Sequence, residues 1–408
     1  MILDRNILEI VEKREGASFY IADLEQFEKN YNILLNSYRK YYKNTSIAYS
    51  YKTNYLPDFC KIIDKNDGFA EVVSGMEMQL ALKIGVKYNK IFFNGPVKEI
   101  HYIEELLVHG GIVNIDSLDE LQKIIQIANS SNKVLRIGMR LNFDVEDSVV
   151  SRFGFDPSHE DFNQALKSID SIVNLKLVSL HCHFATRYLE TWQNRTKGML
   201  NIIDKFFVNR LESIEFISLG GGLYGDMTED MKNQFERFIP SFDDYAEVAS
   251  KVFNEYFEKT EFNPTLIIEP GTAIAANAMK YVTKVEAIKE VQGKNIAVLF
   301  GSTYNINPKA NRKKVPIEIY SVSKERKRFK DIDFAGYTCI ESDYLYKGFS
   351  GDLAVGDFIV FNEVGTYSIV MKAPFIMPQV AIVKIEKNDY VVLKEKETFE
   401  DVFQTYKI

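Results

Sequence analysis

Short apolar runs alternate with longer amphipathic segments from about residue 45 to about residue 275, and this alternation constrains the fold more than any other feature. The segments between the runs predict helices, because their apolar residues recur every three or four positions; examples are Met76–Ile84, Glu99–Val108, Leu118–Ala128 and Tyr245–Phe257. The apolar runs predict eight strands, at Thr45–Lys52, Phe69–Ser74, Lys90–Pro96, Ile112–Ser117, Val134–Asn142, Leu177–Phe184, Glu215–Leu223 and Thr265–Ile274.

Strand and helix units that follow one another in this way predict a closed (β/α)8 TIM barrel, a fold of the α/β class. Each parallel strand feeds a right-handed crossover, and the last strand returns beside the first. An open doubly wound sheet is the structural alternative. Its usual signature, a Gly-x-Gly-x-x-Gly turn after the first strand, is missing from the sequence.

The pattern changes after Ala275, where helical periodicity gives way to strand-like runs. We therefore predict a barrel domain over residues 26–275 and a C-terminal all-β domain over residues 276–408, joined by a strand from residues 1–25 at Ser18–Ala22. The strands predicted in the second domain are Tyr281–Val291, Asn295–Leu299, Ile317–Val322, Gly336–Glu341, Asp357–Asn362 and Val380–Ile385.

The composition excludes several classes of protein. The chain has 408 residues and a net charge of -7, and no basic tract is long enough to follow a nucleic-acid backbone. No apolar run approaches the roughly 20 residues of a membrane span, so we expect a cytoplasmic protein with neither nucleic acid nor membrane as a partner. Three widely spaced cysteines, Cys60, Cys182 and Cys339, argue against a disulfide framework and a structural zinc site.

Conspicuous polar and glycine residues fall at the carboxyl ends of the predicted barrel strands, which is where barrels of this kind keep their active sites. They are Lys52, Glu77, Arg140, His181, His183, Gly220-Gly221-Gly222 and Glu269-Pro270-Gly271. Consecutive glycines let main-chain N–H groups approach an anion closely, and the loops after the seventh and eighth strands are the usual phosphate site of a barrel. A merely flexible loop is the alternative interpretation of the three glycines.

Lys52, a phosphate cradle and a carboxylate on the last strand together suit pyridoxal 5′-phosphate. Lys52 would hold the aldehyde carbon as an imine, Glu269 would pair with the pyridine nitrogen, and His183 would stack on the ring. Alone, Lys52 would be interpreted as a solvated strand-end lysine. Because His181 and His183 are two apart on a predicted strand, a His-x-His metal site is the competing interpretation.

Successive motifs resemble those of the diaminopimelate/ornithine decarboxylases, and the similarity spans nearly the whole chain. The second domain carries a Gly-x-x-Cys-x-x-x-Asp segment, in which the cysteine is Cys339 and the aspartate is Asp343. The other motifs are Tyr-Ser-Tyr-Lys52-Thr-Asn, Glu71-Val-Val-Ser-Gly-Met-Glu77, Phe93-Asn-Gly-Pro, Asn114-Ile-Asp-Ser, Arg152-Phe-Gly, His181-Cys-His183, Gly220-Gly-Gly, Glu269-Pro-Gly and Gly365-Thr-Tyr367-Ser.

The resemblance implies a TIM barrel with a β-domain, pyridoxal phosphate on Lys52, and a head-to-tail homodimer. It implies that Cys339, Asp343 and Tyr367 reach a site built mainly by the partner subunit's barrel, with Cys339 as the proton donor and Asp343 beside the substrate. The residues it assigns to cofactor binding are Lys52, Glu71, Arg140, His183, Thr186, Gly220, Gly221, Gly222, Glu269, Gly271, Thr272 and Tyr367.

Two departures from the family pattern bear on cofactor and substrate. Thr272 stands where the family commonly has an arginine that helps to hold the phosphate, and Thr186 stands where it has a phosphate-contacting serine. Ile340 stands where an acidic residue meets the distal amine of the diamino substrate; Glu341 is one residue displaced from that position. An aliphatic side chain cannot balance an ammonium group, so we expect that the usual diamino acids are not the substrate.

Two groups of cations are available for a different substrate: Arg187, and the basic run Lys309, Arg312, Lys313 and Lys314. The alternative interpretation of Arg187 is an ordinary surface residue. These cations favour an amino acid with an additional carboxylate or a carrier-linked acyl group. The predicted activity is a pyridoxal-phosphate-dependent amino-acid decarboxylase. The alternatives are an amino-acid racemase on the same barrel, a metal-dependent barrel hydrolase, and a non-catalytic carrier of pyridoxal phosphate.

Overall fold

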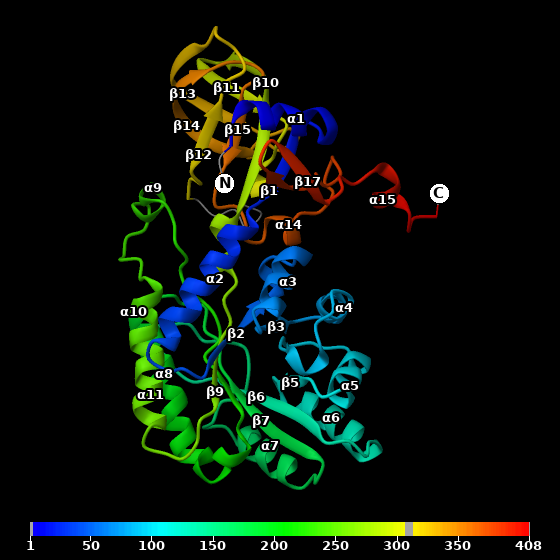
Figure 1. Cartoon of the computed structure of the whole chain (residues 1–408), viewed down its shortest axis with the longest axis vertical. Helices are drawn as coiled ribbons and strands as arrows, with labels where there is room; N and C mark the ends of the chain where they lie inside the picture. Colours follow the sequence, from blue (N-terminus) through cyan, green and yellow to red (C-terminus); the bar gives the residue numbers. More distant parts are fainter. Residues whose placement is uncertain (1–2, 307–312, 408) are drawn as a thin grey trace. The chain divides into compact units, whose positions relative to one another are not determined.

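The computed structural model describes residues 3–306 and 313–407 (Figure 1). The chain divides into two compact units. The barrel unit comprises Glu28–Gly225 and Phe238–Ala273, and the β unit comprises Met1–Phe27, Asp226–Arg237 and Ile274–Ile408. No helix in the described part of the chain is long and apolar enough to cross a membrane.

Eight parallel strands of the barrel unit close into a barrel in chain order, which confirms the predicted (β/α)8 fold. Closure is made by the first and last strands, where Thr45 lies in register with Leu266. The strands are β2 (Thr45–Ser50), β3 (Phe69–Val72), β4 (Ile91–Phe93), β5 (Ile112–Ile115), β6 (Leu135–Arg140), β7 (Leu175–His181), β8 (Phe216–Ser218) and β9 (Thr265–Ile268).

All eight strands end earlier than the sequence predicts, because the polar and glycine residues at their carboxyl ends leave the sheet to form loops. Apolar side chains fill the barrel interior, among them Phe69, Phe92 and Phe216, whose rings meet at centroid distances of 5.2–5.6 Å. Since the interior is packed, a small molecule reaches this unit at the ends of the strands and not through the centre.

Helices follow the barrel strands and lie around their outside (Figure 1). Their first turns are capped by short polar side chains: Ser74 accepts a hydrogen bond from Glu77 N, and Ser117 accepts one from Glu120 N. The α-helices of this unit are α2 (Leu24–Arg39, which begins in the β unit), α3 (Pro57–Lys65), α4 (Gly75–Lys83), α5 (Ile100–Val108), α6 (Leu118–Ser130), α7 (Glu160–Asp170), α8 (Leu189–Ile202), α10 (Phe242–Ala246), α11 (Val252–Phe257) and α12 (Thr272–Ala275).

Short irregular turns interrupt this pattern, and two of them extend longer helices. The π-helical turns Ile203–Phe207 and Glu247–Lys251 continue α8 and join α10 to α11. The 3-10 turns are Tyr51–Thr53, Tyr88–Lys90, Val208–Ser213 and Ala276–Ala278. The first of these places Lys52 directly after β2.

Nine strands form the sheet of the β unit. Strand β1 pairs antiparallel with β10 and parallel with β16, and Phe19 and Ile21 from β1 pack with Leu8 and Val11 of helix α1. The strands are β1 (Ser18–Ala22), β10 (Met279–Val291), β11 (Lys294–Leu299), β12 (Ile317–Tyr320), β13 (Lys327–Ala335), β14 (Tyr344–Leu353), β15 (Phe358–Phe361), β16 (Ile382–Glu386) and β17 (Asp389–Lys394), and the helices are α1 (Arg5–Glu15), α9 (Glu229–Lys232), α13 (Thr303–Ile306), α14 (Ser368–Met371) and α15 (Phe399–Phe403).

The prediction of a strand at Gly336–Glu341 is wrong, because this segment is a loop between β13 and β14. Gly336 lies against the carboxylate of Asp343, where a Cβ atom would stand 2.1 Å from Oδ2. Strands β13 and β14, on either side of this loop, and strand β17 were missed. In β13 charged residues alternate with apolar ones, so the apolar run that marked the other strands is absent.

Candidate active site

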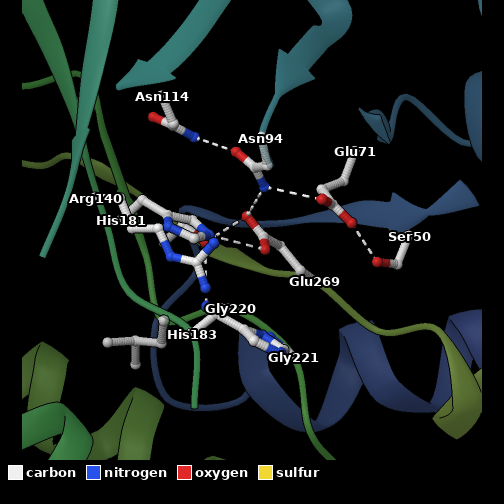
Figure 2. A network of polar contacts seen from close by, with 12 residues as sticks. Ser50, Glu71, Asn94, Asn114, Arg140, His181, His183, Gly220, Gly221 and Glu269 are labelled. Carbon is white, nitrogen blue, oxygen red and sulfur yellow. Dashed lines mark hydrogen bonds and ion pairs between the residues drawn. The ribbon is translucent and has the colours of Figure 1, made fainter. Parts of the chain in front are cut away.

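A cavity of about 230 Å³ opens at the carboxyl ends of the barrel strands. Six of the polar residues singled out in the sequence line it: Lys52, Glu71, Arg140, His181, His183 and Glu269. Asn94 and Phe153 also line it, although neither was assigned a role from the sequence. The barrel therefore gathers residues from the ends of strands β2, β3, β4, β6, β7 and β9 around one space, and Figure 2 shows several of them from close by.

Lys52 meets a buried carboxylate at the edge of this cavity. Its Nζ lies 2.6 Å from Oε2 of Glu71 and 2.8 Å from Oγ of Ser50, and Ser50 donates its own hydrogen bond to the same carboxylate oxygen. The side chain of Glu71 is 1% exposed, whereas that of Lys52 is 37% exposed. Lys52 thus bonds to a buried carboxylate, while its own side chain stays partly accessible.

Glu269 follows strand β9 and is held by side chains from the ends of strands β4, β7 and β8; Figure 2 labels two of them, Asn94 and His181. Its Oε1 accepts hydrogen bonds from Ser218 at 2.8 Å and Asn94 at 3.3 Å, and its Oε2 lies 3.0 Å from Nε2 of His181. Burial by itself raises the pKa of Glu269, but the imidazole of His181 and the charge of Lys52 outweigh it and lower the pKa to about 2. The carboxylate is therefore ionised at neutral pH.

His183 lies beside the glycine loop that follows β8. Gly221 N donates a hydrogen bond of 2.9 Å to Nδ1 of His183, which requires that this nitrogen carry no proton. Burial lowers the pKa of His183 well below its usual range, and Lys52 adds to this effect, so its ring is neutral. Gly220 and Gly222 have φ angles of 72° and 85°, and a Cβ on Gly221 would stand 2.2 Å from Glu269 O.

Arg195, in the middle of α8, organises the same loop and was missed by the sequence analysis. Its guanidinium is fully buried and donates to the carbonyl groups of Leu219, Gly221 and Phe184 at 2.6–2.9 Å, and to Thr186 O at 3.4 Å. A helical arginine gives no sequence signal of this role, because surface helices commonly carry arginine.

The other predicted cofactor residues of the barrel unit, Gly220–Gly222 among them, are not among the residues that line this cavity. Gly271 packs against Thr53, since a Cβ there would meet Oγ1 at 2.0 Å. Thr272 begins helix α12, and Thr186 presents its carbonyl group to Arg195. The guanidinium of Arg187 lies over the Tyr224 ring at 5.4 Å and is not among the residues that line the cavity.

The predicted residues of the β unit gather on and near one loop. Cys339 and Glu341 are exposed there and Ile340 is half-buried. Asp343 is buried, and its carboxylate accepts hydrogen bonds from Ser302 Oγ, Thr303 N, and both the N and the Oγ1 of Thr338.

Tyr367 is the residue before helix α14 and has a left-handed φ of 62°. In the basic run, Lys309 and Arg312 lie outside the described residues. Lys313 contacts Gln234 O at 2.6 Å, and Lys314 lies over the Tyr346 ring at 5.1 Å. Both lysines of this run that the structure describes therefore have contacts within the β unit.

The cavity fits pyridoxal phosphate by the chemistry of its residues. The accessible amine, the ionised carboxylate and the neutral imidazole that line it match the aldehyde, the ring nitrogen and the ring face of that cofactor, and the glycine loop beside His183 suits its phosphate. The histidines, in contrast, have separate partners, Glu269 for His181 and Gly221 for His183. Among residues 3–306 and 313–407, no group of three or more His, Cys, Asp or Glu side chains could hold a metal ion.

Comparison with known proteins agrees with this geometry. Residues 28–276 match the family model described as "Pyridoxal-dependent decarboxylase, pyridoxal binding domain". The chain is 26% identical to a diaminopimelate decarboxylase of Archaeoglobus fulgidus, over 98% of this chain and 95% of the relative. It is also 26% identical to a protein of the same name from Methanocaldococcus jannaschii, over 97% of this chain and 92% of the relative.

Solved structures agree in fold. The crystal structure of a diaminopimelate decarboxylase from M. jannaschii superposes with a TM-score of 0.85 at 24% identity, covering 98% of this chain and 94% of that one. That of a diaminopimelate decarboxylase from Helicobacter pylori, complexed with L-lysine, superposes with a TM-score of 0.82 at 22% identity, covering 97% and 98%.

Proposed function

The chain belongs to the pyridoxal-dependent decarboxylases, and from this premise we propose that Lys52 is the residue that binds pyridoxal phosphate covalently. The protein is thus a pyridoxal-phosphate-dependent amino-acid decarboxylase, a carboxy-lyase. Its relatives carry the names of decarboxylases, so the racemase, hydrolase and carrier alternatives find no support there.

The observation that carries the assignment of Lys52 is its position between a buried base and an open cavity. Its Nζ lies 2.6 Å from Glu71 and faces the space that Glu269 and His183 also line. A lysine is a nucleophile only after it has lost a proton. Oε2 of Glu71 is the nearest acceptor for that proton, and Ser50 Oγ, in contact with both groups, keeps the two atoms together.

The remaining residues of the cavity would bind the cofactor and orient it. Glu269 would present an ionised oxygen for the pyridine nitrogen, and His183 would offer its neutral ring face. We assign the phosphate to the side of the glycine loop, in which the Gly220 and Gly221 N–H groups already donate to Ser218 Oγ and His183 Nδ1. The chemistry that pyridoxal phosphate supplies when bound is an electron sink for the charge left behind as CO₂ departs. Glu269 strengthens that sink by stabilising a protonated ring nitrogen.

Replacing Lys52 tests the assignment. The Lys52→Ala variant should lose covalent trapping by borohydride and the absorbance of the lysine-bound cofactor at roughly 400–430 nm. Lys98→Met is not a suitable control, because Lys98 is buried against Glu120. The matched control is Lys61→Ala, because Lys61 is exposed. Covalent trapping that persists in Lys52→Ala would place the reactive amine elsewhere.

The active assembly that we propose is a homodimer in which Cys339 and Tyr367 of one subunit complete the barrel site of the other. Cys339 is exposed on its loop and is the proposed donor of the proton that replaces the carboxylate. The resemblance described above supports both statements.

Mixed subunits test the shared site. Lys52→Ala and Cys339→Ala are each expected to be inactive, but a mixture that exchanges subunits should regain about a quarter of native activity, because half of the dimers contain one intact site of two. A mixture that stays inactive while sedimentation shows dimers would mean that both residues act within one subunit.

For the substrate, we propose an amino acid whose side chain carries no ammonium group that needs an acidic partner at position 340. The loop fixes its own register: Ile340 N donates to Thr338 Oγ1 at 3.4 Å, and Ile340 O accepts from Asp343 N at 3.0 Å. Glu341 therefore cannot move into the place of Ile340 by a one-residue slip. The second candidate is meso-diaminopimelate, which the names of the relatives favour.

Release of CO₂ from a panel of amino acids separates the two candidates. Loss of one charge-assisted hydrogen bond is worth about 1.5–3 kcal/mol, or roughly ten- to a hundredfold in affinity. Turnover of meso-diaminopimelate with kcat/KM near or above about 10⁴ M⁻¹s⁻¹ would establish the second candidate. Otherwise Ile340→Glu should raise activity toward diamino acids, and the neutral Ile340→Gln should not.

A further inference from the structure

One side-chain amide, that of Asn94, lies between the two buried carboxylates of the candidate active site (Figure 2). Asn94 follows strand β4, and its Nδ2 donates to Glu71 Oε1 at 3.0 Å and to Glu269 Oε1 at 3.3 Å. An amide nitrogen carries two hydrogens, so each carboxylate receives one. Asn94 is thus the hydrogen-bonded link between the lysine end and the ring-nitrogen end of the cavity.

The orientation of this amide is fixed from behind. Asn114, on the next strand β5, donates through Nδ2 to Oδ1 of Asn94 at 2.7 Å. If the Asn94 amide were turned over, its oxygen would face both Glu71 and Glu269, which offer only acceptor atoms when ionised. The network therefore allows one orientation, with the nitrogen toward the carboxylates.

The two carboxylates need such a link because both are removed from water. Glu71 is 1% exposed and Glu269 is 4% exposed. Two like charges that share a buried site normally force one of them to take up a proton. The other charged or titratable groups that face the pair are Lys52, His181, His183, Arg140 and Glu77.

We propose that Asn94 is a positioning residue that allows Glu71 and Glu269 to stay ionised together, by giving one amide hydrogen to each. The proposal rests on the proposed function only for the tasks of the two carboxylates, which are to take the proton of Lys52 and to face the ring nitrogen. Both tasks require the charged form. A neutral Glu71 could not accept a proton, and a neutral Glu269 could not stabilise a positive ring nitrogen.

A pair of double variants tests this role in the protein without cofactor. Infrared difference spectra report the carbonyl band of protonated carboxyl groups as the pH is lowered. In Asn94→Ala, one buried carboxyl group should titrate about one to two pH units higher than in the native protein, since it has lost a hydrogen bond to its charged form. Adding Glu71→Gln should reverse this change, because a single carboxylate no longer meets a like charge.

Ser218→Ala is the matched control. It removes a donor from Glu269 alone, at 2.8 Å, and leaves the amide between the carboxylates in place. Glu71→Gln removes a like charge in both backgrounds, but it should lower the titration pH by less in Ser218→Ala, because there the amide still lies between the two positions. The proposal is overturned if Asn94→Ala leaves the titration unchanged, or if Glu71→Gln reverses both variants to the same extent.

A more conservative variant covers the case in which Asn94→Ala does not fold. Asn94→Ser keeps one donor, which can bond to one carboxylate at a time. It should raise the pH at which the carboxyl group titrates by about half as much as Asn94→Ala does. An effect equal to zero would count against the proposal. These spectra do not depend on the covalent cofactor, so their failure is distinct from failure of the Lys52 assignment, which borohydride trapping tests alone.

Discussion

Replacing Arg195 should loosen the glycine loop without touching the cavity itself. The guanidinium is fully buried in α8, and its two terminal nitrogens donate to four carbonyl groups on two loops. One loop contains Gly221, whose N–H meets His183, and the other follows His183 directly. Arg195 therefore ties the glycine loop to the loop that follows His183.

Its contribution can be worked out from these contacts. Three of the four hydrogen bonds are 2.6–2.9 Å long, and each buried acceptor left without a donor costs about 1–3 kcal/mol. Because such effects are not additive, we expect Arg195→Met to lower the free energy of unfolding by about 3–5 kcal/mol. Affinity for pyridoxal phosphate should fall about tenfold or more, since the loops must then be ordered on binding.

Urea unfolding followed by circular dichroism and titration with pyridoxal phosphate measure the two effects. Arg195→Lys, which keeps the charge but not the fork of donors, should give a smaller loss of both. The matched control is Thr196→Val in the same helix, because the hydroxyl of Thr196 donates to Trp192 O within α8. If Arg195→Met loses stability but binds the cofactor as tightly as the native protein, the loops do not depend on Arg195 for their binding geometry.

Three further variants follow from the same geometry. Glu269→Gln should lower kcat by orders of magnitude and leave borohydride trapping intact, because the ring nitrogen and the lysine are separate ends of the site; an unchanged kcat would remove Glu269 from the mechanism. Burial raises the pKa of Glu77 to about 7, so the folded state holds a proton that the unfolded state has released, and stability falls as pH rises from 4.5 to 7. Glu77→Gln should remove this loss, worth about 3 kcal/mol, and a pH-independent difference in Tm between the two proteins would contradict it. Arg187→Ala should raise KM for the native substrate if its guanidinium meets a carboxylate, and an unchanged KM would leave Arg187 as a partner of Tyr224 only.

The sequence predicted the barrel and much of the cavity, because a barrel converts chain order into position. Once eight strands and their direction are known, every residue at a carboxyl strand end must lie near the same mouth. Lys52, Arg140, His183 and Glu269 were identified in this way, and all four line the cavity. Periodicity sufficed here because buried parallel strands are continuously apolar and end sharply at polar or glycine residues.

Hydrogen-bond partners could not be predicted in the same way. Ser50, Asn94 and Ser218 are small polar residues at strand ends, where such residues are common for many reasons. Their roles depend on which neighbouring strand places an acceptor within 3 Å, and that depends on register, which chain order does not give. The sequence also placed a strand at Gly336–Glu341, where a buried carboxylate outside the segment holds the chain in a loop instead.

That carboxylate, Asp343, was expected beside the substrate from the resemblance alone, and its own hydrogen bonds argue for a different task. A carboxylate has about four sites that accept hydrogen bonds, and Asp343 fills them with Ser302, Thr303 and the two donors of Thr338. A direct bond from Asp343 to a substrate would break one of these contacts and leave a buried donor unpaired, at a cost of about 1–3 kcal/mol. The contacts fix Thr338, the residue before Cys339, so we propose that Asp343 positions the Cys339 loop and does not bind the substrate directly.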